Sequence, residues 1–281
     1  MELKHIAMRD GRLSSFLKEE MKMSTGLVNR LKWQEMIFVN AAPQHNDYQV
    51  KAGDVITALL DEEEPHYPPQ EGSLTIVYED EHLMAVDKPA GMLIHPSHSK
   101  NDGTLANYVL GYFLRTGQKC AFHPVTRLDR DTFGIVLLTK NSHVHALMQQ
   151  TSFQKTYHAL VCGGPAEEAG IINAPIARKP LPSLLREVRA DGKESITEYR
   201  VLERAEGITK LALTPVTGRT HQLRVHCAYM GFPILGDPQY GNGSADFGLS
   251  HQLLCAKRLE FIHPITGEKL VLESKMDAEL P

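Results

Sequence analysis

Apolar and polar residues alternate with two different periods in the first sixty residues. The apolar residues of 13–21 recur at the spacing of one helical face, which predicts a short amphipathic helix. A second helix is expected to begin near Ser24 or Thr25, because a hydroxyl at that place can cap free backbone N–H groups. Two apolar runs, 36–40 and 54–60, are typical of strands, so the segment predicts a compact module of two helices and short strands. The residues that carry the helical patterns are Leu13, Phe16, Leu17, Met21, Leu27, Val28 and Leu31.

Beyond residue 73 the apolar runs are longer, and strand-like and helical patterns are mixed. Helices are expected over about 142–150 and 221–230. Strands and helices do not follow the regular order of a doubly wound sheet, so the pattern predicts an α+β fold. The strand-like runs are 74–78, 83–87, 133–139, 157–161, 195–203 and 209–214.

An acidic, proline-rich segment separates these two regions. Residues 61–73 include Pro65, Pro68 and Pro69 and little apolar surface, so we expect a semi-extended linker there. The predicted division of the chain is therefore a small domain over 1–60, the linker, and a larger domain over 74–281.

The charge of the chain is uneven. The 281 residues carry a formal net charge of −4, which by itself argues against a nucleic-acid partner because counterion release favours basic surfaces. However, the predicted linker alone holds five acidic residues, and 178–193 holds five basic residues against two acidic ones. The pattern of 178–193 fits a basic binding patch and an ordinary solvated loop equally well. Its basic residues are Arg178, Lys179, Arg186, Arg189 and Lys193.

The chain shows neither export nor membrane signals. It begins with charged residues, and no apolar run approaches the roughly 20 residues that span a bilayer. The four cysteines are widely spaced and form no C-x-x-C pair, so neither a disulfide framework nor a zinc ribbon is indicated. A reducing, cytoplasmic location is expected. The cysteines are Cys120, Cys162, Cys227 and Cys255.

The stretch Thr126-Arg-Leu-Asp-Arg-Asp-Thr-Phe-Gly134 places two carboxylates directly before an apolar strand. A carboxylate in that place can be held rigidly while it faces a cleft, although the pattern alone fits a solvated turn as well. The stretch resembles H-R-L-D-x-x-T-S-G, the signature of the RluA-like family of pseudouridine synthases. Further segments agree in order and spacing with that family, and together they cover nearly all of 74–267. They are 86–96 (V-D-K-P-A-G-M-L-I-H-P), 155–157 (K-T-Y), 217–226 (T-G-R-T-H-Q-L-R-V-H), 233–241 and 261–267.

The resemblance implies an α+β catalytic domain with a mixed, mainly antiparallel sheet, and it assigns roles to particular side chains. Asp129 would be the catalytic carboxylate, and Arg224 would pair with it. Tyr157 would stack on the target base, with its hydroxyl near the C5 proton. The substrate-binding residues would be Arg127, which helps to hold the RNA with its base flipped out, Arg219, in the same motif as Arg224, and Leu254, an apolar residue of the base pocket.

Three positions depart from the family pattern. Thr126 and Cys255 stand where a histidine is expected, and Phe133 stands where a serine is expected. None of them replaces the acid, so they bear on the choice of target and the shape of the pocket.

The implied reaction converts uridine in structured RNA, ribosomal or transfer, into pseudouridine. It breaks the N1 glycosidic bond and joins C5 to the same ribose carbon, without net oxidation or hydrolysis. Neither nicotinamide nor a metal is needed, so no cofactor and no metal site are expected, and a monomer is the default for the family. His221 and His226, five residues apart, would lie about 140° apart on a helix and form no metal pair.

The first sixty residues resemble the S4 RNA-binding domain over about fifty residues, on the order of the elements and the apolar runs given above. The second helix of that family presents basic residues to RNA, and here Arg30 and Lys32 are in that place. A structural appendage without RNA contacts is the alternative.

Two other activities are compatible with parts of the sequence. One is a non-catalytic RNA-binding or ribosome-assembly protein. Binding alone would not require Asp129, Tyr157 and Arg224 together, so their presence argues against this alternative. A glycosidase would need two carboxylates facing one sugar, and Asp129 and Asp131 would point the same way on an extended strand. The RNA-type motifs favour the synthase over both.

Overall fold

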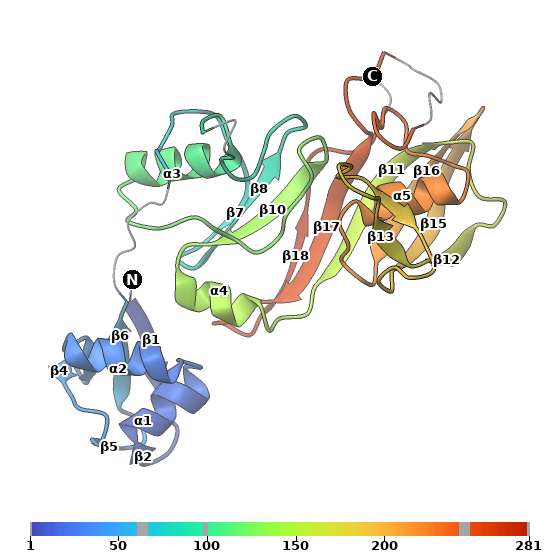
Figure 1. Ribbon diagram of the computed structural model, residues 1–281. Helices are drawn as coiled ribbons and strands as arrows, with labels where there is room; N and C mark the ends of the chain where they lie inside the picture. The colour runs from blue at the N-terminus through green and yellow to red at the C-terminus, as the bar shows by residue number, and fades with distance from the viewer. Residues whose placement is uncertain (1, 61–66, 98–100, 242–247, 280–281) are drawn as a thin grey trace. The chain divides into compact units, whose positions relative to one another are not determined.

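The computed structural model describes residues 2–60, 67–97, 101–241 and 248–279, and the chain divides into two compact units, Met1–Glu64 and Pro65–Pro281 (Figure 1). The predicted linker begins with 61–66, which lie outside the described residues. None of the described helices is both long enough and apolar enough to cross a membrane.

The first unit packs helices against a small antiparallel sheet of order β1-β6-β3-β4. Both predicted helices are confirmed, and the Ser24 hydroxyl caps the second by accepting a hydrogen bond from the amide of Leu27 at 3.2 Å. The apolar residues named above pack inward, so the unit has a core of its own. Its elements are β1 (Glu2–Ile6), β2 (Gly11–Arg12), α1 (Leu13–Ser15), the π-helix η1 (Phe16–Glu20), α2 (Thr25–Trp33), β3 (Ile37–Val39), β4 (Ala42–Pro43), β5 (Gln49–Val50) and β6 (Val55–Leu59).

The second unit is built on a ten-stranded sheet whose main path is β12-β15-β16-β11-β17-β10-β8-β7. Every described pair in it is antiparallel except β10 with β17, so the expected mixed, mainly antiparallel α+β fold is confirmed. The strands are β7 (Thr75–Glu79), β8 (Leu83–Lys88), β9 (His123–Pro124), β10 (Phe133–Thr139), β11 (Gln154–Cys162), β12 (Ala169–Asn173), β13 (Ile176–Arg178), β14 (Arg186–Val188), β15 (Ile196–Ala205), β16 (Ile208–Pro215), β17 (Leu254–Ile262) and β18 (Lys269–Glu273).

Three helices cover this sheet: α3 (Leu105–Arg115), α4 (Ser142–Met148) and α5 (Gln222–Tyr229). Helix α3 packs on Val136 and Leu138 of β10, whereas α4 packs on the alternating Ile135 and Leu137, so these two helices cover opposite faces of β10. Helix α5 lies over β11 and β16 (Figure 1).

Helix α3 was not predicted from the sequence. Its apolar residues do recur at helical spacing, so the sequence carries the pattern of this helix; they are Leu105, Ala106, Val109, Leu110 and Phe113. The backbone of Gln70 lies against Gly111, where a Cβ atom would come within 2.0 Å of the Gln70 oxygen. The end of the predicted linker thus packs on α3 within the second unit.

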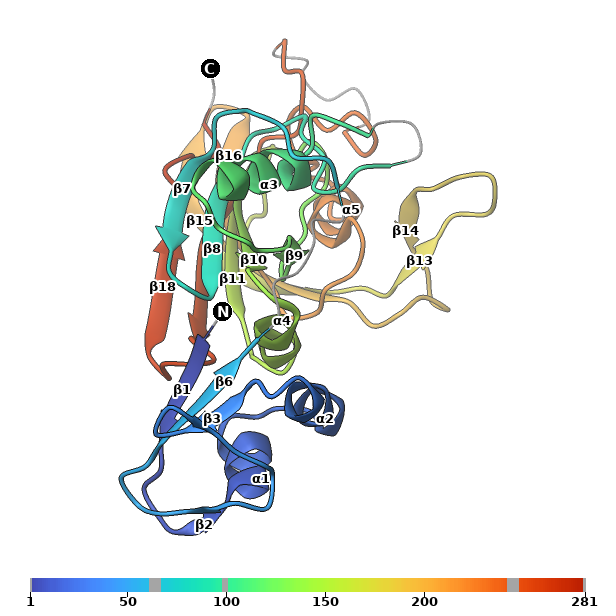
Figure 2. The ribbon, with the colours of Figure 1, turned by 90° about the vertical axis from the view of Figure 1, so that its left-hand side faces the viewer.

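A two-stranded hairpin, β13–β14, stands out from the large sheet (Figure 2). It carries most of the basic residues of 178–193, and Leu181 and Leu184 near its tip are 77% and 71% exposed. The Arg189 side chain pairs with Asp191 and Glu187, which neutralises part of the local charge.

The C-terminal residues pack back onto the large sheet. Asp277 contacts Nδ1 of His158 on β11 at 2.8 Å and the ammonium of Lys210 on β16 at 3.0 Å. Burial opposes the charge of this carboxylate, but its bonds to Lys210 and His158 lower the pKa of Asp277. The segment therefore ties the two central strands together by charge as well as by packing.

Candidate functional site

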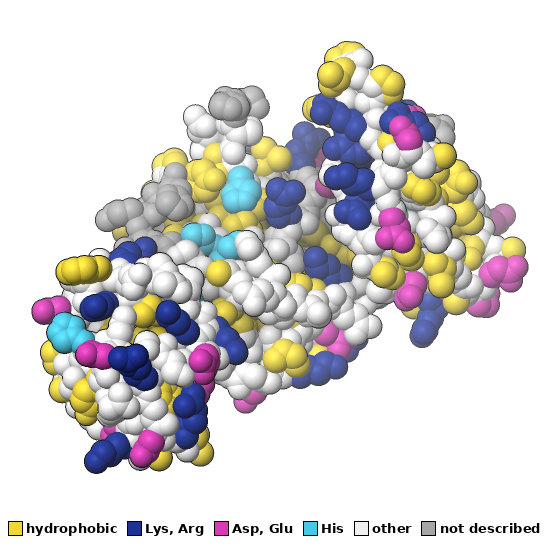
Figure 3. Space-filling model, turned by 60° about the horizontal axis from the view of Figure 1, so that its bottom comes forward, with side chains coloured by type: hydrophobic (Ala, Val, Ile, Leu, Met, Phe, Trp, Pro, Cys, Tyr) yellow, Lys and Arg dark blue, Asp and Glu magenta, His cyan; other side chains and the backbone are white. Residues whose placement is uncertain are grey.

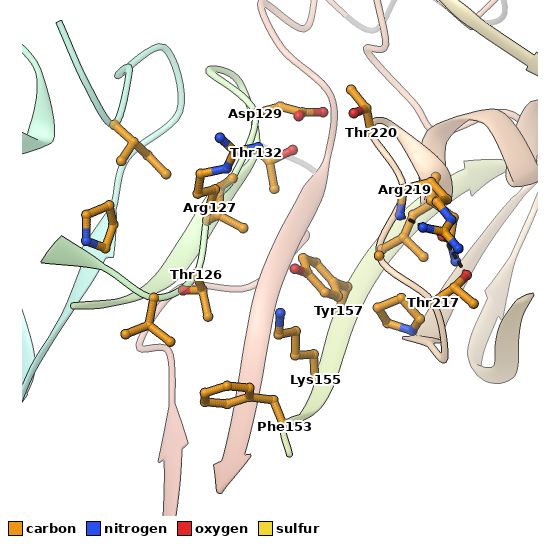
Figure 4. A pocket seen from close by; sticks show the side chains of 18 of the residues that line it. Thr126, Arg127, Asp129, Thr132, Phe153, Lys155, Tyr157, Thr217, Arg219 and Thr220 are labelled. Carbon is orange, nitrogen blue, oxygen red and sulfur yellow. Dashed lines mark hydrogen bonds between the residues drawn. The ribbon is translucent and has the colours of Figure 1, made fainter. Parts of the chain in front are cut away.

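A cleft of about 850 Å³ is lined by residues that include parts of α4 and α5. Figure 4 shows part of this lining from close by. Lys and Arg side chains gather beside a hollow of the surface in the space-filling view (Figure 3). The lining is discontinuous in sequence and comes from residues within 94–95, 124–132, 145–157 and 215–224, together with Leu254. All six predicted site residues are among them.

Asp129 and Arg224 are brought into direct contact by the fold. Nη1 of Arg224, on α5, donates to Oδ2 of Asp129 at 3.0 Å. The Arg224 side chain is only 5% exposed, whereas that of Asp129 is 31% exposed and faces the cleft. The carboxylate is therefore fixed on one side and open to a ligand on the other.

A second acid, Asp237, holds the other edge of the guanidinium. Nε and Nη2 of Arg224 donate to the two Asp237 oxygens at 2.7 and 2.8 Å, and Nη2 also donates to Gln239 at 2.9 Å. Burial alone would lower the pKa of Arg224, but Asp237 and Asp129 raise it. Because Asp237 binds two nitrogens of the Arg224 guanidinium, the guanidinium is fixed and its Nη1–H points at Asp129 in a constant direction. Asp237 lies in the segment 233–241 but was not predicted as a site residue.

The buried Lys88 stabilises the loop that carries Asp129 through hydrogen bonds to backbone carbonyl oxygens. Nζ of Lys88 donates to the carbonyl oxygens of Pro89, Met92 and Arg130 at 2.8–2.9 Å, and the residue is fully buried. Burial lowers the pKa of Lys88 to about 8, against the opposing influence of Asp131 and Asp129. Because Arg130 follows Asp129 directly, this contact fixes the turn that carries the carboxylate.

The backbones of β10 and β17 approach closely at Gly134, where this turn enters β10. Gly134 has φ +105°, a conformation that L side chains rarely adopt. A Cβ atom there would lie 2.4 Å from the Ala256 carbonyl oxygen of the neighbouring strand β17. Glycine is thus required for the close parallel contact of β10 with β17, and Asp129 before β10 and Leu254 at the start of β17 line the same cleft.

Tyr157 projects from β11 into the cleft (Figure 4). Burial, and secondarily the charge of Asp129, raise the pKa of Tyr157 to about 12, so its hydroxyl is protonated at neutral pH. No hydrogen bond of this hydroxyl is found within the described parts of the chain. Leu254, 3% exposed, lies beside it and also packs in the core under α5.

Arg127 and Arg219 are exposed on different walls of the cleft (Figure 4). Arg127 lies two residues before Asp129. Nε of Arg219 donates to the backbone oxygen of Glu194 at 3.0 Å, which directs this guanidinium toward the rim. The structure thus places Arg127 near the carboxylate and Arg219 farther out.

His221 adds a polar group that the sequence analysis did not assign to the site. Its Nε2 lies 3.8 Å from Oδ2 of Asp129, and its Nδ1 lies 2.9 Å from the Tyr240 hydroxyl. Burial lowers the pKa of His221, and Arg224 and Arg186 lower it further against the influence of Asp129. Burial of the ring thus favours its neutral form. Its left-handed backbone, φ 57°, is a tertiary feature without a composition signal.

The three departures from the family pattern have structural partners. The Thr126 hydroxyl accepts a hydrogen bond from the Leu137 amide at 2.9 Å, and Phe133 packs edge-on against His251. Cys255 is buried, with its thiol against the Met276 carbonyl. Only Thr126 of the three lines the cleft.

The second carboxylate that a glycosidase would need does not face the cleft. Asp131 forms two bonds with its neighbour Arg130, at 2.9 and 2.8 Å, and does not line the cleft. His226 is buried between the Thr197 hydroxyl and the Ala174 carbonyl. Across the described ranges, no group of three His, Cys, Asp or Glu residues is arranged to hold a metal ion.

Comparison with known proteins agrees with this geometry. The family model described as RNA pseudouridylate synthase matches residues 82–229. The chain is 35% identical to the uncharacterized RNA pseudouridine synthase YhcT of Bacillus subtilis, over 97% of this chain and 92% of that protein. It is 34% identical to ribosomal large subunit pseudouridine synthase C of Vibrio cholerae, over 96% and 90% of the two chains.

Solved structures agree as well. Human RNA pseudouridylate synthase domain containing 1 superposes with a TM-score of 0.62 at 27% identity, over 75% of this chain and 88% of that one. The fold, the family model and the full-length relatives together lead to one conclusion: this chain belongs to the RluA-like family of RNA pseudouridine synthases, which are isomerases.

Proposed function

We propose that this protein isomerises uridine in structured RNA, ribosomal or transfer, with Asp129 as the catalytic carboxylate. The observation that carries the proposal is the Asp129 carboxylate, open to the cleft and held by the buried Arg224 at 3.0 Å, with Tyr157 beside it. This arrangement supplies a fixed negative charge and an apolar, aromatic surface for one base.

The reaction requires an ionised carboxylate. The N1–C1′ bond breaks, C5 bonds to C1′, the C5 proton is released and N1 gains a proton, so atoms and electrons balance without a redox partner. Arg224 donates to one oxygen of Asp129 and thereby directs the other toward the cleft. Attack on the ribose carbon, attack on the uracil ring and removal of a ribose proton are all compatible with this carboxylate.

The target base must leave its stack before it reaches Asp129. Flipping a base out requires a few kcal/mol. Stacking on an aromatic ring returns roughly 1–3 kcal/mol, and Tyr157 offers such a ring. In this proposal Arg127 holds the opened RNA, Arg219 contacts RNA at the rim, and Leu254 keeps the base pocket dry.

The test of this assignment is Asp129→Asn, which keeps the shape of the side chain and removes its charge. The variant should fold, bind RNA and release no tritium from RNA labelled at C5 of uridine. Arg130→Gln, next to Asp129 but with an exposed side chain bonded to Asp131, is the matched control and should release tritium. Release at the wild-type rate by Asp129→Asn would refute the role of Asp129.

We also propose that the first unit, the predicted 1–60 domain, contacts RNA through the outer face of α2. Asn29, Arg30 and Trp33 share this face at i, i+1 and i+4, and Trp33 is 84% exposed. The Lys32 ammonium lies 5.8 Å from the Trp33 ring centre, so a ring for stacking and positive charge lie together.

Trp33 is the one tryptophan of the chain, which makes this second proposal directly measurable. RNA binding should quench the tryptophan fluorescence of the wild type, and Trp33→Leu should bind RNA more weakly. Unchanged fluorescence at saturating RNA would favour a structural appendage.

A cytoplasmic location and a monomeric state complete the proposal. The four cysteines are free, as suits a reducing compartment. Sedimentation of the protein alone and with RNA tests the monomer, and fractionation of cells tests the location.

A further inference from the structure

Three side chains follow one another along the cleft face of β11. Phe153, directly before the strand, Lys155 and Tyr157 occupy every second position, and all three line the cleft (Figure 4). Because side chains alternate between the two faces of a strand, such residues share a face and stand about 6.5–7 Å apart. Along this strand the cleft is therefore lined by the Phe153 ring, the Lys155 ammonium and the Tyr157 ring, in that order.

Lys155 differs from three other buried or half-buried lysines of this unit. Lys88 donates to three carbonyl oxygens, Lys140 pairs with Glu79 at 2.8 Å, and Lys210 pairs with Asp277 at 3.0 Å. For Lys155, no carboxylate or carbonyl partner exists among the described residues, and its Nζ lies 5.6 Å from the centre of the Phe153 ring. Burial lowers the pKa of Lys155, with no neighbouring acid to raise it.

A partly desolvated ammonium without a counter-charge is unfavourable, and an anionic ligand removes the penalty. The cleft that Lys155 faces belongs to an RNA-modifying family, whose substrates carry one phosphate per nucleotide. A phosphate oxygen is therefore the acceptor whose chemistry fits this position.

The cleft also continues past Lys155, away from Asp129. Phe153 lies at that end (Figure 4), and Met148, Gln149 and Thr151, which precede it in the chain, also line the cleft. This part combines one ring with amide and hydroxyl groups, as a site for a second base requires. The volume of about 850 Å³ lies near the upper end of the range for sites that enclose whole drug-sized ligands.

We propose that this part of the cleft is a second nucleotide subsite. Lys155 binds the phosphate that joins the target uridine to a neighbouring nucleotide, and the base of that neighbour stacks on Phe153 beside Gln149 and Thr151. The enzyme then recognises an unpaired stretch of at least two nucleotides. The inference rests on the proposed function, because it takes the base near Tyr157 as the target.

The experiment replaces the neighbouring base rather than the target. The substrate is the shortest synthetic RNA, cut from ribosomal or transfer RNA, in which the wild type converts a uridine. An abasic nucleotide is placed on the 5′ side or the 3′ side of that uridine, and the dissociation constant and the single-turnover rate are measured. Loss of one stacked base should weaken wild-type binding by roughly 5- to 150-fold on one side only.

Phe153→Leu should remove this effect, so that the intact and abasic RNAs bind the variant alike. Lys155→Met should weaken binding and reduce the slope of log affinity against log salt by about 0.7, and Lys155→Arg should restore both. Lys269→Met is the matched control, since Lys269 is a surface lysine of β18 that does not line the cleft. Thermal unfolding of each variant separates lost contacts from lost folding.

The inference fails if abasic nucleotides on both sides leave wild-type binding unchanged, or if Lys155→Met behaves like Lys269→Met. Binding of a uridine hexanucleotide to the same variants gives a readout that does not depend on conversion. Failure of the wild type to convert any RNA would refute the proposed function, and the hexanucleotide would still report whether Lys155 contacts a phosphate.

Discussion

Replacing Arg224 by methionine should destabilise the second unit and abolish activity together. The substitution leaves the Asp237 carboxylate, whose side chain is fully buried, without its cationic partner. Breaking a buried ion pair by removing one partner destabilises a protein by about 3–5 kcal/mol. For a unit of this size, 1 kcal/mol shifts the melting temperature by about 2–4 °C, so the expected fall is about 6–20 °C.

A second substitution separates the structural from the catalytic consequence. Asp237→Asn in the Arg224→Met background removes the unpaired charge, and the retained oxygen can still accept from the Gln239 and Tyr240 amides. The double variant should therefore be more stable than Arg224→Met. It should remain inactive, because Asp129 has still lost the N–H that directs it.

The assay combines thermal unfolding followed by circular dichroism with tritium release from C5-labelled RNA. Arg224→Lys serves as the conservative comparison, since it keeps the charge but cannot bridge two carboxylates with a fixed fork. If the double variant were no more stable than Arg224→Met, the buried charge would not be the cause of the instability. Wild-type turnover by Arg224→Met would show that Asp129 does not depend on Arg224.

Three further predictions concern Tyr157, the first sixty residues and Asp277. Tyr157→Phe should bind RNA but form product slowly, because its hydroxyl is the nearest candidate for handling the C5 proton. Since the pKa of Tyr157 is raised to about 12, its ionisation should cause no loss of rate below about pH 10, and a loss near that pH absent from Tyr157→Phe would contradict this. Deleting residues 1–60 should weaken RNA binding and flatten the log–log salt dependence by about 0.7–0.9 per lost phosphate contact, while single-turnover conversion at saturating enzyme survives. Unchanged affinity and slope would mean that the first unit makes no phosphate contact. The pKa of Asp277 is lowered in the folded protein, so its contribution to stability is present above its unfolded pKa of about 3.9 and is lost as the pH falls below that value. Melting temperatures between pH 3 and 6 should therefore fall more steeply for the wild type than for Asp277→Asn, and parallel curves would refute this.

The sequence alone determined the local elements and the family. Helical periods indicated the two helices of the first unit, which bury one face. Strand patterns indicated most long strands of the second unit, including the continuous apolar runs of β8 and β10, which are buried on both faces. The motifs around Asp129, Tyr157 and Arg224 indicated the enzyme class, which the family model and the relatives confirm. Helix α3 has the same helical period in its apolar residues but was not predicted, and the burial of Asn107 and Gly111 on its other side is visible only in the fold.

Only the tertiary structure decided which charges meet. Arg224 and Asp129 are 95 residues apart, and no local pattern reveals that a third group, Asp237, holds the same guanidinium. Lys88 and Lys155 both lie in recognised motifs, yet only the fold shows that Lys88 is satisfied by carbonyl oxygens and that Lys155 faces the cleft without an acid. The physical reason is that burial and pairing of a charge depend on strands and helices that are distant in sequence, whereas hydrophobic periodicity is a property of each segment by itself.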